Sequence, residues 1–181
     1  MQQEIAPIAV RPSTLNGISE HMVVSHYENN YGNAVRALNA VRRELAALDA
    51  GTPPYRLRGL KREELSLMGS VALHELYFGN LGGFRRAGPN SGLGRPDWHE
   101  VPDAVAAEIA ADFGGASAWR REFVGTAQSL AGGSGWVLLT YSRRQKRFWN
   151  QIATDHTQAA ATRRPCSFWT CTSTPTRWTS A

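Results

Sequence analysis

Two histidines, His26 and His74, are the residues of this 181-residue chain whose types and positions point most directly to chemistry. An imidazole can bind a metal ion or move a proton near neutral pH. Around His74, the apolar residues Leu67, Val71 and Phe78 recur at steps of three and four. This spacing predicts one apolar helix face, so we expect a buried His74 side chain that needs a partner.

Spacing alone does not make these histidines a metal site. A single histidine on an apolar face is more often a hydrogen-bonded core residue than a ligand. The chain has no short-range pair such as Cys-x-x-Cys or His-x-x-x-His, so it carries no local zinc signature. We expect no catalytic or ligand role for His21 and His99.

The elements that must position His26 and His74 are two long helices. The first is predicted from the N-cap Ser19 to about Leu48, with His26 in its second or third turn, and a glycine and two prolines end it. The second includes residues 60–83. Because antiparallel helices in a hairpin bring the start of one near the end of the other, the two histidines are expected to approach.

In the second half of the chain the residue pattern predicts a different order of elements, with strands as well as helices. A glycine-rich loop at residues 82–95 is the best candidate for a domain boundary. After it we predict two helices and then two strands, at residues 97–112, 116–131, 136–141 and 147–153. The fold class is therefore α+β: an N-terminal antiparallel helical hairpin at residues 1–90, followed by a smaller α/β domain with an antiparallel sheet at residues 91–181.

Composition narrows the function classes only slightly. The net charge is +5 and the pI is about 9.7, which suits an acidic partner or a small anion, although most arginines are expected simply to be solvated. No run of about eighteen apolar residues and no secretory leader pattern occurs, so we expect a cytoplasmic protein without membrane contact. The two cysteines, Cys166 and Cys171, imply no disulfide framework.

Four longer motifs carry a more specific signal. SHYENNYGNAVRALN surrounds His26, LHELYFGNLGG surrounds His74, and DFGGASAWRREF and GSGW follow in order. Together they resemble the iron/manganese superoxide dismutase family over residues 15–158. The resemblance implies one iron or manganese ion per subunit, held by three histidines, one aspartate and a solvent molecule, with His26 and His74 as the first two ligands. It also implies conversion of superoxide to oxygen and hydrogen peroxide, and a homodimer when the chain is complete.

The resemblance also implies roles for residues around the metal. Trp136 matches an aromatic side chain that walls the metal pocket. Either His156 or Gln158 matches a group that hydrogen-bonds the metal-bound solvent and tunes its pKa. Many members carry a histidine and a gateway tyrosine where this chain has Asn30 and Ala34, and Tyr31 could substitute in part. Tyr77 and Phe78 are expected to pack beside His74.

Residues 159–181 depart from the resemblance. The family continues with a strand and an Asp-x-x-x-His motif that supplies the last two ligands, whereas no Asp, Glu or His follows His156 here. If translation is shifted to the third base of each codon, the pair Phe168–Trp169 must encode leucine and the pair Trp169–Thr170 must encode aspartate. With allowed codons the shifted stretch can read APALLVLDMYEHAYAMDFG, which contains the missing motif.

We therefore hypothesise that a one-base gain or loss between about Gln158 and Arg164 replaced the end of a dismutase with an out-of-frame, truncated tail. Two neutral imidazoles without a carboxylate would bind metal weakly, and the sheet would be incomplete, lacking a strand and exposing an edge. The chain would then be an inactive family member, or a basic binding protein with an acidic partner such as nucleic acid. The family reading, with superoxide as substrate, is preferred to nucleic-acid binding.

Overall fold

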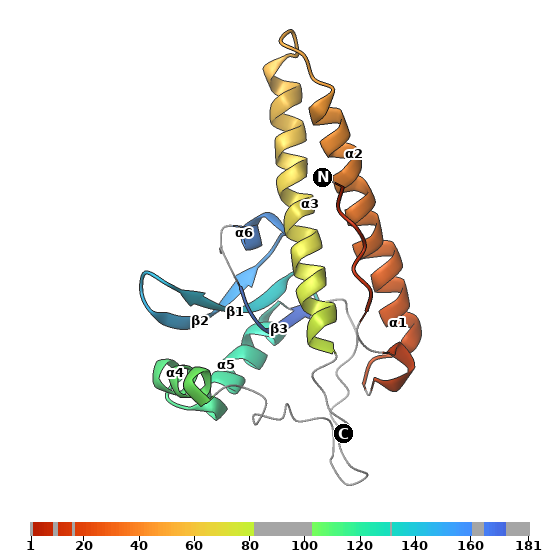
Figure 1. The fold of residues 1–181 in the computed structure, drawn as a ribbon. Helices are drawn as coiled ribbons and strands as arrows, with labels where there is room; N and C mark the ends of the chain where they lie inside the picture. Colours follow the sequence, from red (N-terminus) through yellow and green to blue (C-terminus); the bar gives the residue numbers. More distant parts are fainter. Residues whose placement is uncertain are drawn as a thin grey trace.

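The computed structural model describes residues 2–8, 11–15, 17–81, 103–130, 132–160 and 165–172, the last range and residues 159–160 by their backbone alone. The predicted boundary loop at residues 82–95 lies wholly outside these ranges, as does the start of the helix predicted from residue 97. Figure 1 shows a long helical hairpin beside a small sheet. No helix within the described ranges is long and apolar enough to cross a membrane.

The first half of the hairpin is one continuous helical stretch made of three segments. The segments are α1 (Glu20–Ser25), the π-helical turn η2 (His26–Tyr31) and α2 (Gly32–Ala46). Ser19 caps the start, and its side-chain oxygen accepts a hydrogen bond from the Met22 amide at 3.2 Å. The helix predicted from Ser19 is confirmed. The π-helical turn that begins at His26 is not visible in the residue pattern, and such turns often occur at functional sites.

The second half of the hairpin is α3 (Pro54–Asn80), a 27-residue helix that runs antiparallel to α2 (Figure 1). Pro54 occupies the first turn, where its missing amide hydrogen costs nothing. The two helices share a buried core of apolar side chains: Val23, Tyr31, Ala34, Val35, Leu38, Val71, Phe78 and Leu81. Burial of this shared face fixes the pairing of the helices.

Before the hairpin, a short 3-10 helix, η1 (Pro12–Thr14), follows an extended N-terminal segment. Residues 2–8 of this segment are held on the hairpin by hydrogen bonds. The Gln3 amide donates to Asn39 Oδ1, and Asn39 Nδ2 donates to the Gln3 carbonyl, both at 2.8 Å. The Tyr27 hydroxyl donates to the Ala6 carbonyl at 2.8 Å. The segment therefore packs as a strap along α2.

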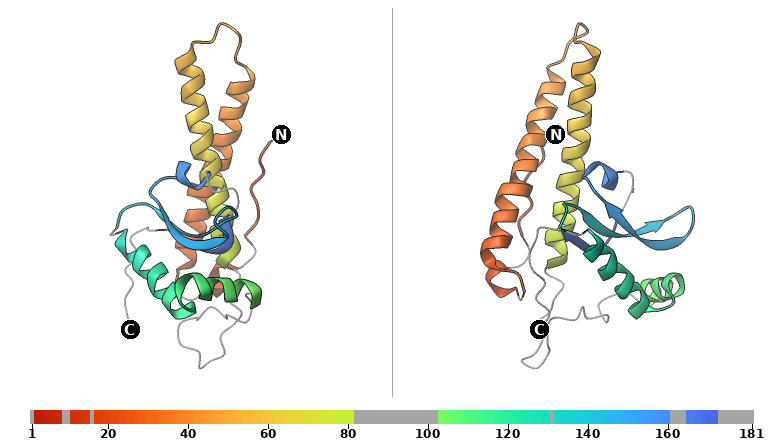
Figure 2. Two further views of the ribbon diagram at one scale, coloured as in Figure 1. Left: turned by 90° about the vertical axis from the view of Figure 1, so that its left-hand side faces the viewer. Right: turned by 180° about the vertical axis from the view of Figure 1, so that it is seen from behind.

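The described residues of the C-terminal part form three helices and a three-stranded antiparallel sheet in the order β2-β1-β3. The elements are α4 (Asp103–Phe113), α5 (Ala116–Ser129), β1 (Trp136–Ser142), β2 (Arg147–Ala153), α6 (Thr157–Ala160) and β3 (Pro165–Thr172). The α+β class and the two predicted strands are confirmed. Figure 2 shows α4 and α5 together on one side of the molecule, away from the tip of the hairpin.

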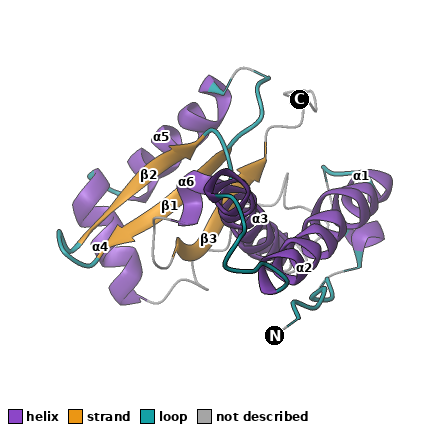
Figure 3. Cartoon of the chain, turned by 90° about the horizontal axis from the view of Figure 1, so that it is seen from above, coloured by secondary structure: helices purple, strands orange, loops and turns teal. Residues whose placement is uncertain are grey.

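Strand β1 joins the two halves because both of its faces are buried. Val137 and Leu139 pack against Trp119 and Phe123 of α5, whereas Trp136 and Leu138 face the other way and pack with Leu73 of α3. This division follows from the alternation of side chains along a strand. Seen from above, the sheet accordingly lies between α5 and α3 (Figure 3).

The expectation that the sheet lacks its last strand is wrong. The backbone of β3 pairs antiparallel with β1, with Trp136 opposite Thr172, Leu138 opposite Thr170, and an irregularity before Thr140 and Pro165. Strand pairing uses backbone amides and carbonyls, which almost any residue supplies, and threonine and aromatic residues favour strands. The segment PCSFWTCT can therefore occupy the open edge of β1 although it lacks the family motif.

Candidate metal centre

His74 lies on α3 facing β1, and its side chain is 3% exposed. Its Nδ1 atom is 2.7 Å from the carbonyl oxygen of Ser70, one helical turn earlier. A carbonyl only accepts hydrogen bonds, so Nδ1 must carry the proton and donate it. In the neutral ring the lone pair then resides on Nε2. This bond fixes the tautomer that a metal bound through Nε2 requires.

His26 lies on the neighbouring helix, with its ring centroid 4.9 Å from that of His74. The hairpin thus brings together the two imidazoles that the helix spacing predicts to approach. The Nε2 atom of His26 is buried and has no hydrogen-bond partner among the residues that the structure describes. Leaving a buried polar atom unpaired is costly, so such an atom in a folded protein requires an explanation, for which a metal ion is one candidate.

Burial lowers the pKa of both imidazole rings. Loss of solvent lowers the pKa of His26, and it lowers the pKa of His74 to about 4. The hydrogen bond to Ser70 opposes the shift at His74, while the neighbouring imidazoles of His26 and His156 add to it. Both rings are therefore neutral at pH 7, as a metal ligand must be.

Aromatic side chains enclose the two imidazoles. The centroid of the Trp136 ring lies 5.1 Å from that of the His74 ring, and the two rings are nearly perpendicular. The ring centroid of Phe78 lies 6.4 Å from that of His74, so Phe78 packs beside His74 as expected, whereas the ring centroid of Tyr77 lies 5.4 Å from that of His26. Together these rings form a low-polarity wall around the nitrogen atoms.

The structure distinguishes between His156 and Gln158, the two alternatives that the sequence analysis gives for a hydrogen bond to metal-bound solvent. The His156 ring is 5.9 Å from His74 and 5.8 Å from Trp136, and burial lowers its pKa. Gln158 instead turns back on its own loop, where its Oε1 accepts from the Thr154 amide at 2.7 Å. Only His156 of this pair lies against the imidazoles.

Tyr31, proposed from sequence as a partial substitute for a gateway tyrosine, is 1% exposed. Its ring stacks 6.3 Å from His74. Its hydroxyl accepts a hydrogen bond from the Ala6 amide at 2.8 Å and donates one to Glu75 at 3.0 Å. Asn30 is exposed and Ala34 is part of the core. The hydroxyl of Tyr31 is therefore already engaged by two protein groups.

Sequence reasoning missed three residues that the structure places beside these side chains. Ser70 could have been found, because its carbonyl lies one turn before His74 in the same helix. Glu75 and Gly69 carried no such signal. Glu75 bonds to Tyr31 on the other helix, and Gly69 touches the distant backbone of His156, so both relationships depend on the tertiary fold.

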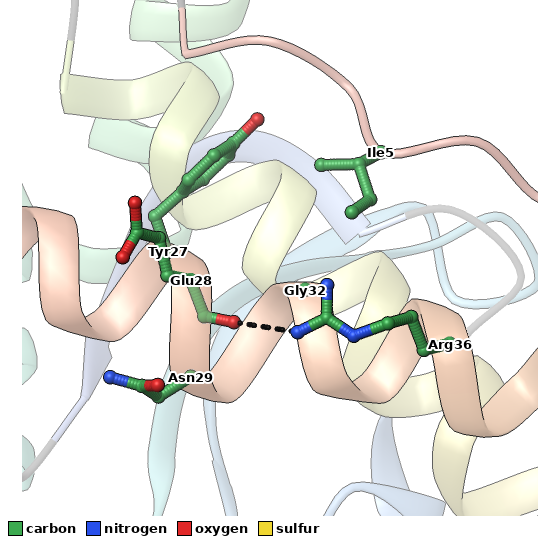
Figure 4. Close-up of a pocket in the computed structure, with 6 residues that line it drawn as sticks. All are labelled: Ile5, Tyr27, Glu28, Asn29, Gly32 and Arg36. Atoms are coloured by element: carbon green, nitrogen blue, oxygen red, sulfur yellow. Dashed lines mark hydrogen bonds between the residues drawn. The ribbon is translucent and has the colours of Figure 1, made fainter.

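A separate pocket of about 410 Å³ lies under the N-terminal strap (Figure 4). It is lined by Ile5, Tyr27, Glu28, Asn29, Gly32 and Arg36. The Arg36 guanidinium lies across its floor and donates to the Glu28 carbonyl at 3.3 Å. None of the lining residues is a histidine, so this pocket is distinct from the imidazole pair.

The described residues fit part of a metal site but not a whole one. His26 and His74 provide two neutral nitrogen donors that suit a first-row transition metal. Within the described ranges, however, no group of three or more His, Cys, Asp or Glu side chains is arranged to hold a metal ion. A carboxylate that would offset the charge of the metal is missing from this set.

Comparison with known proteins decides the family. Over 162 residues the chain is 44% identical to the protein named superoxide dismutase [Fe] of Cupriavidus metallidurans, covering 89% of this chain and 75% of that protein. This chain belongs to the iron/manganese superoxide dismutase family. A profile of "Iron/manganese superoxide dismutases, C-terminal domain" also matches residues 101–169.

Other family members resemble the chain more distantly. It is 31% identical over 130 residues to superoxide dismutase [Fe] of Methanothermobacter marburgensis, covering 72% of this chain and 59% of that protein. It is 28% identical over 163 residues to superoxide dismutase [Mn] 2 of Haloferax volcanii, covering 88% and 73%. Relatives thus carry iron and manganese in their names, and the family is one of metal-dependent oxidoreductases.

Proposed function

We propose that this chain is built for superoxide dismutation at a metal held on one side by His26 and His74. The supporting observation is the buried, unpartnered Nε2 of His26, with its ring 4.9 Å from a second neutral imidazole. In this family a bound iron or manganese supplies the two oxidation states that convert superoxide to oxygen and hydrogen peroxide. Family membership supports assigning the same reaction to the gene from which this chain derives.

The surrounding residues have separate proposed roles. His156 is the proposed hydrogen-bonding group near metal-bound solvent, supported by its position 5.9 Å from His74. Trp136 is the proposed wall of the pocket, since it packs edge-on against the same ring. Gln158 and Tyr31 are proposed to act indirectly, because their polar atoms bond to Thr154 and to Glu75.

We also propose that residues 159–181 are out of frame, so that the chain as printed lacks the aspartate and the third histidine ligand. The residue types after His156 support this proposal, because they include no Asp, Glu or His. The codons of Trp169 and Thr170 support it further, because a shifted reading forces an aspartate there. The 181-residue chain should therefore bind iron or manganese weakly and show little dismutase activity.

The wider biological setting is likewise proposed. A homodimer with an antioxidant role in the cytoplasm is what the family resemblance suggests. The lack of cysteine before Cys166 is compatible with a reducing compartment. We propose the hairpin domain as residues 1–90 and the α/β domain as residues 91–181, supported by separate buried cores in the two halves.

Two chains test the proposed function. One is the 181-residue chain as printed, and in the other the residues after Thr162 are replaced by APALLVLDMYEHAYAMDFG. Each is expressed with iron or manganese in the medium, and metal content and superoxide consumption are then measured. The replaced chain should bind metal near one ion per chain and be active, whereas the printed chain should do neither. A His74→Gln change in the replaced chain should remove both properties.

Either of two results would contradict the proposal. Full metal content with dismutase activity in the printed chain would mean that residues 159–181 do not disable the site. A replaced chain that folds, yet binds no metal and is inactive, would refute the assignment of His26 and His74 as ligands. Sequencing the coding DNA from the Trp149 codon onward tests the frame independently.

A further inference from the structure

Gly69 of α3 lies directly against the backbone of the loop that carries His156. A Cβ atom built on Gly69 would stand 1.9 Å from the His156 carbonyl oxygen and 2.8 Å from its carbonyl carbon. Both atoms are backbone, so no side-chain rotation could relieve the overlap. The loop would have to move away from α3 by more than about 1 Å before ordinary contact distances returned.

This close approach is specific to one position of the helix. Gly59 and Gly79 lie on the same helix, and a Cβ atom at either would meet nothing within 4 Å. Neither of them therefore needs to be glycine for reasons of space. Gly69 immediately precedes Ser70, whose carbonyl orients His74, so the contact with the loop lies next to the imidazole pair.

The loop itself is braced so that it presents His156 as a rigid unit. Gln158 Oε1 accepts a hydrogen bond from the Thr154 amide at 2.7 Å, and Gln158 Nε2 donates to Thr154 Oγ1 at 3.1 Å. Asp155 Oδ1 accepts from the Thr157 amide at 2.6 Å. These bonds join residues before His156 to residues after it, so a shift of the loop backbone should carry the imidazole with it.

We infer that Gly69 is a positioning residue for His156: the missing side chain lets the braced loop seat on α3 and holds the imidazole beside His74 and Trp136. Gln158 takes part by bracing the loop, which accounts for its orientation away from the imidazoles. The inference rests on the proposed function only for the role that His156 has beside His74. The contact between Gly69 and the loop itself involves neither metal nor superoxide. Any residue larger than glycine at position 69 should displace His156.

The test compares Gly69→Ala with Gly59→Ala, an identical change in the same helix at a position with open space. The first readout is the NMR cross-peak between the rings of His156 and Trp136. The second is the rate at which diethylpyrocarbonate modifies His156, followed by mass spectrometry with the exposed His21 as reference. Both are made on the metal-free 181-residue chain, so failure of the proposed function would leave them unaffected.

In Gly69→Ala the cross-peak should be lost and His156 modification should rise by about fivefold, as expected when a local contact opens. Gly59→Ala should retain the cross-peak and the parent rate. The cross-peak between His26 and His74 should survive in both variants, which separates displacement of the loop from a general loss of packing. An unchanged His156–Trp136 cross-peak and rate in a folded Gly69→Ala chain would overturn the inference.

A second variant keeps the test decisive if Gly69→Ala does not fold. Gln158→Ala removes both bonds to Thr154 but leaves α3 intact. His156 modification should again rise relative to His21, by less than in a chain whose loop is pushed off the helix. A Gln158→Ala chain with the parent rate and cross-peak would show that the loop does not need its brace, and the inference would fail.

Discussion

Tyr31 donates a hydrogen bond to Glu75 across the helical hairpin, with the phenolic oxygen 3.0 Å from Oε1. Tyr31 ends the π-helical turn that begins at His26, and Glu75 directly follows His74 on α3. The bond therefore ties the two helices together at the level of the imidazole pair. The Tyr31 hydroxyl also accepts from the Ala6 amide, so the strap is joined to the same point.

The first prediction concerns this bond. Tyr31→Phe should lower the free energy of unfolding by about 1–3 kcal/mol, because the buried hydroxyl of Tyr31 makes two hydrogen bonds, one of them to a carboxylate, and both are lost. The control is Tyr55→Phe, since Tyr55 is 68% exposed and its change should leave the unfolding free energy nearly the same. Urea denaturation of the two variants and the parent measures the difference. Equal stability of Tyr31→Phe and the parent would contradict the prediction.

The strap gives a second prediction. Asn39→Asp replaces the amide that donates to the Gln3 carbonyl with a carboxylate oxygen, which repels that carbonyl. Hydrogen exchange at the Gln3 and Ala6 amides should become faster, and the protein should lose about 1–3 kcal/mol of stability. Asn33→Asp is the matched control, because Asn33 is exposed and its oxygen can still accept from Arg36. Unchanged exchange at both amides in Asn39→Asp would show that the bonds of Asn39 do not hold the strap on α2.

The third prediction is a pH dependence of stability in the metal-free chain. Burial lowers the pKa of His74 to about 4 from 6.5, and it also lowers the pKa of His26 and of His156. Between these limits the unfolded chain binds more protons than the folded one. The free energy of unfolding should therefore fall as the pH drops from about 6.5 toward 4.

Urea denaturation in the presence of a chelator, repeated across that pH range, measures this slope. His74→Gln should make the slope shallower, because one of the three imidazoles that favour the unfolded state in acid has been removed. A parent slope that His74→Gln leaves unchanged would mean that His74 does not contribute to the acid sensitivity.

The fourth prediction concerns metal removal. A ligand that binds only the folded state stabilises it by about 2.7 kcal/mol when its concentration is one hundred times its Kd. Manganese should therefore raise the melting temperature of the chain with the replaced tail, and a chelator should reverse the rise. The printed chain should respond much less, because its described residues lack a group of three ligands. An equal rise in both chains would contradict the proposed defect.

Local patterns in the sequence determined most of the secondary structure. The helix from Ser19, the apolar face around His74 and the strands at Trp136 and Arg147 all follow from side-chain periodicity and caps, which act over a few residues. The same patterns implied the hairpin and hence the approach of His26 to His74. The motifs around these histidines were long enough to indicate the family.

Tertiary structure alone decided how the site is supported. The contact of Gly69 with His156, the bond from Tyr31 to Glu75 and the orientation of Gln158 each depend on where another segment of the chain lies. The pairing of β3 with β1 was mispredicted for a related reason. Side-chain motifs indicate ancestry, but a strand is held at a sheet edge by backbone hydrogen bonds, which an unrelated sequence can also make.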